Sequence, residues 1–158
     1  MNANKTDTVV TPKTRLENRL AAPAVLPAML ALQQVVNESS LESSLVELVK
    51  LRASQINRCA FCIDMHYADA LARGERADRL YLLDAWEETD RYTPRERAAL
   101  HWAEAVTRLP DAGVSDAVFA QARANFSEAE LQELTLAIVA INGWNRFNVA
   151  FRVPPGTE

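Results

Sequence analysis

Apolar residues recur along the chain at the intervals of an α-helix. In one stretch the apolar positions Leu41, Leu45, Leu48, Val49 and Ile56 all fall on the same helical face. Upstream, Ser39 and Glu42 have the spacing of a capping box, in which two side chains pair with free backbone amides. The pattern therefore predicts a helix of about four turns that begins after Ser39 and buries one face.

The same periodicity predicts further helices on both sides of this one. Thr93, Pro94 and Glu96 give a strong start signal, Ser127 with Glu130 forms a second capping box, and Gly74 marks a helix end. No alternating apolar and polar run of the kind typical of strands is bounded by turns. We therefore predict an all-α fold with helices over 28–37, 59–73, 76–88, 94–109, 116–124 and from 128 through 141.

Length and composition indicate one compact domain. The chain has 158 residues, of which 49% are hydrophobic and 24% are charged, with 4 glycines and 7 prolines. A chain of this size can bury a substantial core without disulfide bonds. Because the first residues are polar, we expect a mobile tail over residues 1–14 and a single helical domain over residues 15–158.

Charge and hydropathy exclude several classes of protein. The net charge is −4, so we predict no nucleic-acid partner. We find neither a signal sequence nor an apolar run of about 20 residues, and we predict a cytoplasmic protein with no membrane partner. In a reducing compartment, two closely spaced cysteines are more often redox groups or metal ligands than a structural disulfide.

The segment NRCAFCIDMH, residues 57–66, holds both cysteines and one of the two histidines. On a helix, Cys59, Cys62 and His66 lie on one face, since they are three and four residues apart. If Asn57 caps this helix, both thiols lie in its first turns, where free amides and the helix dipole favour a thiolate. Such a pair can also close reversibly into a disulfide.

Thiol chemistry needs a route for protons, and two residues are candidates for it. His66 lies one turn beyond Cys62, and Glu47 lies between Val46 and Leu48 in the preceding apolar helix. A short link over residues 55–58 would let the two helices pack with Glu47 facing the thiols. A buried carboxylate there could orient the imidazole and accept a proton.

Two segments of the chain resemble each other. Residues 43–57 and 129–142 both carry Glu-Leu followed by Ile-Asn, each with a predicted capping box upstream. Beyond the shared asparagine, Trp144, Phe147 and Phe151 occupy the slots of Cys59, Cys62 and His66. We treat a degenerate internal helical repeat, whose second copy lost the chemistry, as a hypothesis.

The four chemical residues, at their spacing, resemble the alkylhydroperoxidase D-like (AhpD-like) branch of the carboxymuconolactone decarboxylase family. The pattern is a glutamate, twelve residues to a cysteine, CxxC, and a histidine four residues later, here Glu47, Cys59, Cys62 and His66. KLRASQINRCAFCIDMH is similar to the signature segment, and INGWNR is similar to the closing helix. The resemblance covers roughly residues 15 to 152.

This resemblance implies an AhpD-like helical bundle that assembles as a homo-oligomer, a trimer or a hexamer, and acts as a thiol hydroperoxidase. Cys62 would attack an organic hydroperoxide, Cys59 would close the disulfide, and Glu47 with His66 would relay protons. A thioredoxin-like or lipoyl dithiol would reduce the enzyme, with no cofactor or resident metal. Better-studied members have a histidine between the cysteines, where this chain has Ala60 and Phe61.

Other interpretations of the same residues stay open at this point. Cys59, Cys62, His66 and Glu47 form a sulfur, nitrogen and oxygen set that zinc accepts. A non-enzymatic helical oligomer could use the thiols to sense oxidants, and the family also contains lactone decarboxylases, which generally lack the cysteine pair. The simplest alternative is structural: buried cysteines that only pack, a Glu47 paired with Arg52 or Lys50, and a core or interface role for His101.

Overall fold

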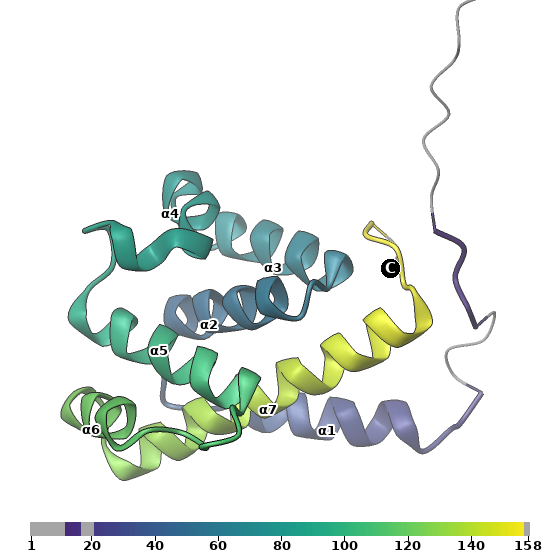
Figure 1. Ribbon diagram of the computed structural model, residues 1–158. Helices are drawn as coiled ribbons and strands as arrows, with labels where there is room; N and C mark the ends of the chain where they lie inside the picture. Colours follow the sequence, from purple (N-terminus) through teal and green to yellow (C-terminus); the bar gives the residue numbers. More distant parts are fainter. Residues whose placement is uncertain (1–11, 17–20, 157–158) are drawn as a thin grey trace, which may run out of the picture.

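The chain folds into helices joined by short turns. The computed structural model describes residues 12–16 and 21–156, and it contains no strand within them, which confirms the predicted all-α class (Figure 1). Most of the predicted tail, residues 1–14, lies outside the described residues. The elements are α1 (Val25–Asn37), α2 (Ser43–Ile56), α3 (Ala60–Ala72), α4 (Ala77–Tyr81), the 3₁₀ helix η1 (Leu83–Glu88), α5 (Pro94–Arg108), α6 (Asp116–Asn125) and α7 (Glu128–Phe151).

Helix α2 is the centre of the bundle. It packs against α3, α5 and α7, and every residue from Leu45 to Ser54 is buried, so the predicted single buried face extends around the whole helix. The long helix α7 crosses below it and packs against α1, while α6 packs chiefly against α5 (Figure 1). Gly143 permits a close approach there, since a Cβ atom at this position would lie 3.0 Å from the Met29 methyl group of α1.

The core consists of three clusters of buried residues. The largest joins α2, α5, α6 and α7 and includes Val49, Trp102 and Leu134. A second lies between α2, α5 and the α4–η1 segment, around Trp86. The third is small and contains both cysteines with Ala53 and Ile141, so the thiols lie in an apolar setting between α2, α3 and α7.

Several helix ends are those that the local sequence predicts. Thr93 and Glu96 form a reciprocal capping box at the start of α5, and Ser127 and Glu130 form another at the start of α7. Each box pairs two backbone amides that lack partners within the helix. Gly74, with φ +91°, follows the end of α3 in the left-handed conformation that glycine adopts without strain.

Two predicted helix starts are wrong. Helix α1 begins at Val25 instead of at residue 28, because Pro27 falls in its first turn, where a backbone NH has no helical partner to lose. Ser39 and Glu42 form no capping box: Glu42 itself is the N-cap of α2 and makes no side-chain cap bond. Its carboxylate instead accepts a 3.0 Å hydrogen bond from Arg95 of α5.

The predicted segment 76–88 divides into α4 and η1, with Ala85 outside helical geometry. Its apolar residues Leu80, Leu83 and Trp86 are nevertheless all buried, as their spacing indicates.

The two similar segments are both helical, but different structures follow them. The first turns sharply at residues 57–59 between α2 and α3, whereas the second continues without a break through Asn142 as α7. A duplicated helix pair is therefore absent at these positions, and the degenerate repeat remains a hypothesis about the sequence.

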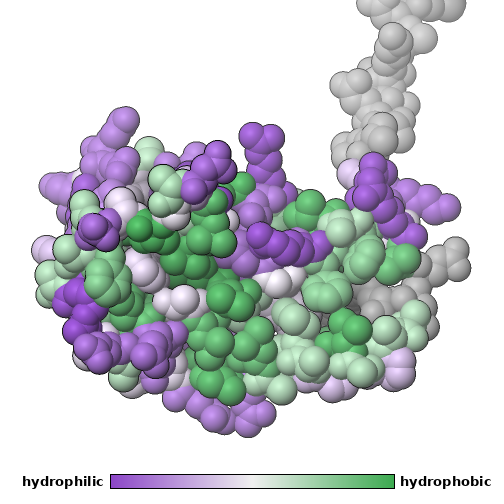
Figure 2. Space-filling model, turned by 60° about the horizontal axis from the view of Figure 1, so that its bottom comes forward, coloured by the Kyte–Doolittle hydropathy of each residue, from purple (hydrophilic) through white to green (hydrophobic). Residues whose placement is uncertain are grey.

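Part of the surface is apolar. In Figure 2 the lower side of Figure 1 is turned toward the reader, and hydrophobic side chains gather on this face. Several large apolar residues are exposed on helices α1, α6 and α7, namely Leu30, Val35, Phe119, Val139 and Val149. Within the described residues, no helix combines the length and the hydropathy that crossing a bilayer requires.

Replacing Leu134 with alanine is expected to lower the free energy of unfolding by about 2 to 5 kcal/mol, because it leaves a cavity in the largest core cluster. Leu71→Ala is the control, since Leu71 of α3 is 40% exposed and lies outside the core clusters, so its truncation creates no cavity. Urea titration measures both changes. Equal losses for the two variants would contradict this account of the core.

Candidate active site

The turn between α2 and α3 places both cysteines. Asn57 ends α2 as its C-cap, Arg58 adopts a left-handed φ of +54°, and Cys59 is the N-cap of α3. The prediction that Asn57 caps α3 is therefore wrong. The side chain of Asn57 instead donates hydrogen bonds of 2.8 Å to the side-chain oxygens of Asn142 and Asn145 on α7.

The two sulfur atoms lie in contact. Both cysteines are free and buried, and the Cys59 thiol donates to the Cys62 Sγ over 2.6 Å. The Cys62 backbone NH in turn points to the Cys59 Sγ at 3.4 Å, which is the capping contact of α3. The predicted convergence of the two thiols is present.

The electrostatic environment makes the two thiols unequal. The hydrogen bond with Cys62 and burial raise the pKa of Cys59 well above the usual thiol range. The hydrogen bond from Cys59 lowers the pKa of Cys62 below its ordinary value; burial opposes this, while amides of Asn148 and Asn145 and the charge of His66 add to it. Cys62 is thus the cysteine that ionises first.

Glu47 and His66 form the second half of the site. The Glu47 Oε2 lies 2.8 Å from the His66 Nδ1, and the Glu47 Oε1 accepts a 3.1 Å hydrogen bond from the Lys50 ammonium group. All three side chains are buried. Helix α2 supplies the glutamate and the lysine at a spacing of three residues, and α3 supplies the histidine across the helix pair.

This pairing keeps Glu47 ionised. Burial alone raises the pKa of a carboxyl group, but the hydrogen bonds and charges of His66 and Lys50 outweigh it and lower the pKa of Glu47 to about 2. Since the carboxylate can only accept, the Nδ1 atom of His66 carries the proton of that hydrogen bond. A neutral ring then has its free lone pair on Nε2.

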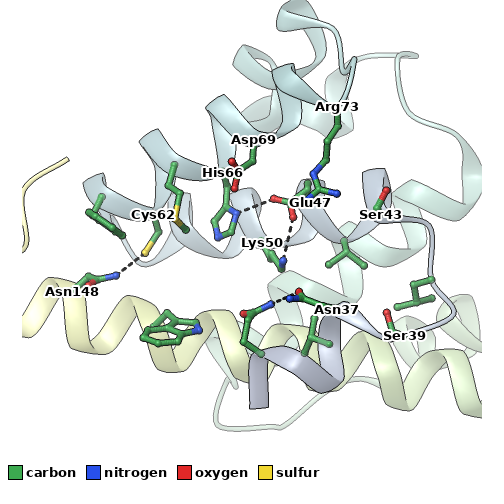
Figure 3. A pocket seen from close by; sticks show the side chains of 17 residues that line it. Asn37, Ser39, Ser43, Glu47, Lys50, Cys62, His66, Asp69, Arg73 and Asn148 are labelled. Atoms are coloured by element: carbon green, nitrogen blue, oxygen red, sulfur yellow. Dashed lines mark hydrogen bonds and ion pairs between the residues drawn. The ribbon is translucent and has the colours of Figure 1, made fainter. Parts of the chain in front are cut away.

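Both halves of the site line one pocket. The pocket has a volume of about 600 Å³ and is bordered by α1, α2, α3 and α7 (Figure 3). Cys62 and Asn148 lie at one end, and Glu47, His66 and Lys50 lie further along (Figure 3). Phe61, Met65 and Trp144 form an apolar part of the wall, while Cys59 does not line the pocket.

Sequence reasoning missed the amides of α7, although it named Lys50 as an alternative partner of Glu47, and that pair is present. Asn142, Asn145 and Asn148 recur every three residues, so they form a polar stripe on an otherwise apolar helix, and that regularity was a usable signal. Asn148 Nδ2 lies 3.3 Å from the Cys62 Sγ, and Asn145 Nδ2 donates to the Ser54 Oγ at 3.0 Å. His101 lies outside the pocket lining, against Trp86.

The four-residue zinc set proposed from the sequence is not brought together. Among the described residues, the potential ligand atoms that lie within 4.8 Å of one another belong to Glu47, His66 and Asp69, and neither sulfur joins them. The ammonium group of Lys50 already occupies one Glu47 oxygen and opposes a cation there. The donor set therefore does not fit a zinc site of the predicted kind.

Comparison with known proteins agrees with this geometry. The model of the carboxymuconolactone decarboxylase family matches residues 23–105, a range that includes Glu47, both cysteines and His66. The chain belongs to this family. An uncharacterised Bacillus subtilis protein, YdfG, is 41% identical over 129 residues, which cover 82% of this chain and 88% of that protein.

Solved structures place the chain in the AhpD-like branch. A protein of unknown function from Agrobacterium tumefaciens, named as a candidate AhpD antioxidant defence protein, is 42% identical with a TM-score of 0.88; the match covers 92% of this chain and all of that one. The debrominase Bmp8 matches with a TM-score of 0.76 and 20% identity over 85% of this chain and 73% of its own, which shows the shared fold.

Glu47 should make stability depend on pH in acid. Its folded pKa of about 2 lies below the usual 4.5, so its contribution is complete above about pH 4.5 and is lost as the pH falls toward 2. Between about pH 6 and about pH 3, wild type should lose about 2 kcal/mol more unfolding free energy than Glu47→Gln. Denaturant titrations measure this, with the exposed Glu88→Gln as a control that keeps the wild-type slope.

Iodoacetamide should label Cys62 before Cys59 in the reduced protein at neutral pH. The pKa of the Cys62 thiol is lowered, and this side chain lines the pocket. The pKa of Cys59 is raised, and its side chain does not line the pocket. Fragmentation mass spectrometry of the labelled peptide identifies the modified sulfur. Faster labelling of Cys59 would reverse the roles assigned to the two thiols.

Proposed function

We propose that the protein is a thiol-dependent alkylhydroperoxidase that reduces organic hydroperoxides with Cys62 and Cys59. The observation that carries the proposal is the contact of two free sulfurs, 2.6 Å apart, beside a pocket that also holds the Glu47–His66 pair. The name of the 42% identical Agrobacterium tumefaciens protein, which refers to antioxidant defence, supports it.

The proposed reaction begins at Cys62. Its thiolate attacks the terminal oxygen of the hydroperoxide, the O–O bond breaks, and the sulfur becomes a sulfenic acid while an alcohol leaves. The Cys59 sulfur, already in contact, then attacks the Cys62 sulfur and displaces water, which leaves a disulfide. Two electrons have passed from the thiols to the peroxide.

His66 carries protons in this scheme, and Glu47 positions it. The leaving alkoxide needs a proton, and an imidazole can donate one and regain it during the next turnover. Glu47, with its pKa of about 2, is too weak a base to exchange protons at neutral pH. Its carboxylate instead accepts the hydrogen bond from the His66 Nδ1 and so orients the ring.

The cycle closes when an external dithiol of thioredoxin-like or lipoyl type reduces the disulfide through a mixed disulfide. We propose that the protein works as a homo-oligomer, a trimer or a hexamer, because exposed apolar residues on α1 and α7, including Leu30, Val35 and Val139, need a partner to leave water. Sedimentation velocity of the reduced protein tests the assembly, and a monomer would contradict it.

The proposed activity is tested by following cumene hydroperoxide reduction with a dithiol reductant. Cys62→Ser and Cys59→Ser should each abolish turnover. One equivalent of hydroperoxide should convert wild type to a disulfide without added oxygen, whereas Cys59→Ser should retain one oxygen atom on Cys62. Intact mass spectrometry distinguishes these products. Full activity in both variants would remove the basis of the proposal.

His66→Asn should reduce the rate by about 10² to 10⁴-fold, because it removes the proton donor. His101→Asn provides a matched control, since His101 lies outside the pocket lining and should keep the wild-type rate. Steady-state rates with the same hydroperoxide compare the two variants. Equal rates would exclude His66 from proton transfer.

A further inference from the structure

Two hydrogen-bond donors converge on the sulfur of Cys62. The Cys59 thiol approaches from 2.6 Å on the same helix, and the Asn148 side-chain amide approaches from 3.3 Å on α7. Cys62 Sγ therefore accepts from both sides, which is the arrangement that suits a negative sulfur. Neither the family pattern nor the spacing of the cysteines points to Asn148.

The backbone that carries Asn148 is anchored at the end of α7. Its backbone carbonyl accepts a 2.9 Å hydrogen bond from the Val153 NH, and Arg152 turns the chain in the left-handed conformation directly after α7. One turn earlier, Asn145 is fully buried and tied to Asn57 and Ser54 of α2. The stripe of amides thus fixes α7 against the turn that carries Cys59.

Helices α2 and α3 place titratable groups around Cys62, whereas α7 does not. The titratable or charged groups that line this pocket are His66, Asp69 and Arg73 on α3 with Glu47 and Lys50 on α2, and Cys59 lies against the sulfur itself. Helix α7 contributes only Trp144 and the Asn148 amide to the pocket lining. An amide does not titrate, so its dipole acts on the sulfur at every pH.

We infer that Asn148 is a catalytic residue of the dithiol site, which stabilises the Cys62 thiolate through a neutral hydrogen bond from α7. Asn148 and His66 act at different steps. Asn148 stabilises the negative sulfur of Cys62 before the attack, and His66 transfers the proton afterwards. The inference rests on the proposed function for its role in turnover. The protonation state of the sulfur, however, can be measured without any peroxide.

Asn148→Leu should raise the pKa of Cys62 by about one unit, since it replaces the amide donor by an apolar group of similar size. The measurement is the pH profile of iodoacetamide labelling of the reduced protein. Trypsin cleavage after Arg58 and Arg73 leaves both cysteines in one peptide, residues 59–73, and fragmentation assigns the label to Cys62.

Two further readouts follow from the same change. A less acidic thiolate is intrinsically more nucleophilic, and the pKa of Cys62 is about 6 in the wild type. At about pH 5, where one unit of pKa costs about tenfold in thiolate, hydroperoxide reduction should therefore slow only roughly threefold, and at neutral pH, where the loss of thiolate is about twofold, the rate should barely change. Loss of the donor also destabilises the reduced form, which should shift the dithiol–disulfide equilibrium by up to tenfold toward the disulfide, about 30 mV in a glutathione redox titration.

Asn125→Leu is the matched control, because Asn125 is also half-buried but lies at the end of α6 and bonds only to its own helix through its side chain. It should leave the Cys62 profile unchanged. Asn148→Asp keeps the shape of the side chain and places a negative charge beside the sulfur, so it should raise the Cys62 pKa by more than Asn148→Leu does. If the leucine variant fails to fold, the aspartate variant tests whether Asn148 affects the pKa of Cys62.

A wild-type Cys62 profile in a folded Asn148→Leu or Asn148→Asp protein would overturn the inference, whatever the peroxidase activity. A shifted profile in Asn148→Leu, with Asn125→Leu unshifted, supports it even if wild type reduces no hydroperoxide. That last result would defeat the proposed function and leave the assignment of Asn148 to the thiolate intact.

Discussion

The structure depends on one constraint: a helix that is buried on every side carries charges that must all be paired. Helix α2 is buried from Leu45 to Ser54, and this stretch includes Glu47, Lys50 and Arg52. An unpaired ion in such a place costs several kcal/mol, about 3 to 5 when one partner of a buried pair is removed. Glu47 is met by Lys50 and His66, and Arg52 is met by Glu104 of α5.

The pairing that stabilises α2 also prepares the site. Because Glu47 has to be compensated, the His66 ring is held by its Nδ1 and cannot rotate freely, while Nε2 stays outside that hydrogen bond. The thiols, by contrast, lie in an apolar cluster, where the hydrogen bonds from Cys59 and from the α7 amides do most to lower the pKa of Cys62 and the charge of His66 adds to them. One pocket is thus bordered by the buried ionic cluster of Glu47, Lys50 and His66 and by Cys62 of the buried dithiol.

The shared fold does not by itself decide the chemistry. A debrominase has the same architecture at 20% identity, and the family takes its name from a lactone decarboxylase. Reaction type therefore follows from the side chains that line the pocket. In this chain, Ala60 and Phe61 separate the cysteines, so no imidazole lies between the sulfurs, and amides from α7 lie nearby instead.

The sequence by itself determined the helical class and the capping boxes at Thr93 and Ser127, because each depends on side chains only a few positions apart. Glu47, Cys59, Cys62 and His66 were singled out as a set by the resemblance to the family pattern. Only the tertiary structure decided which partner a polar side chain takes. Glu42 binds Arg95 instead of capping α2, and Asn57 binds α7 instead of capping α3. Asn148 meets Cys62 across 86 positions of sequence. Such choices depend on the distance between helices after packing, a quantity that local spacing does not contain.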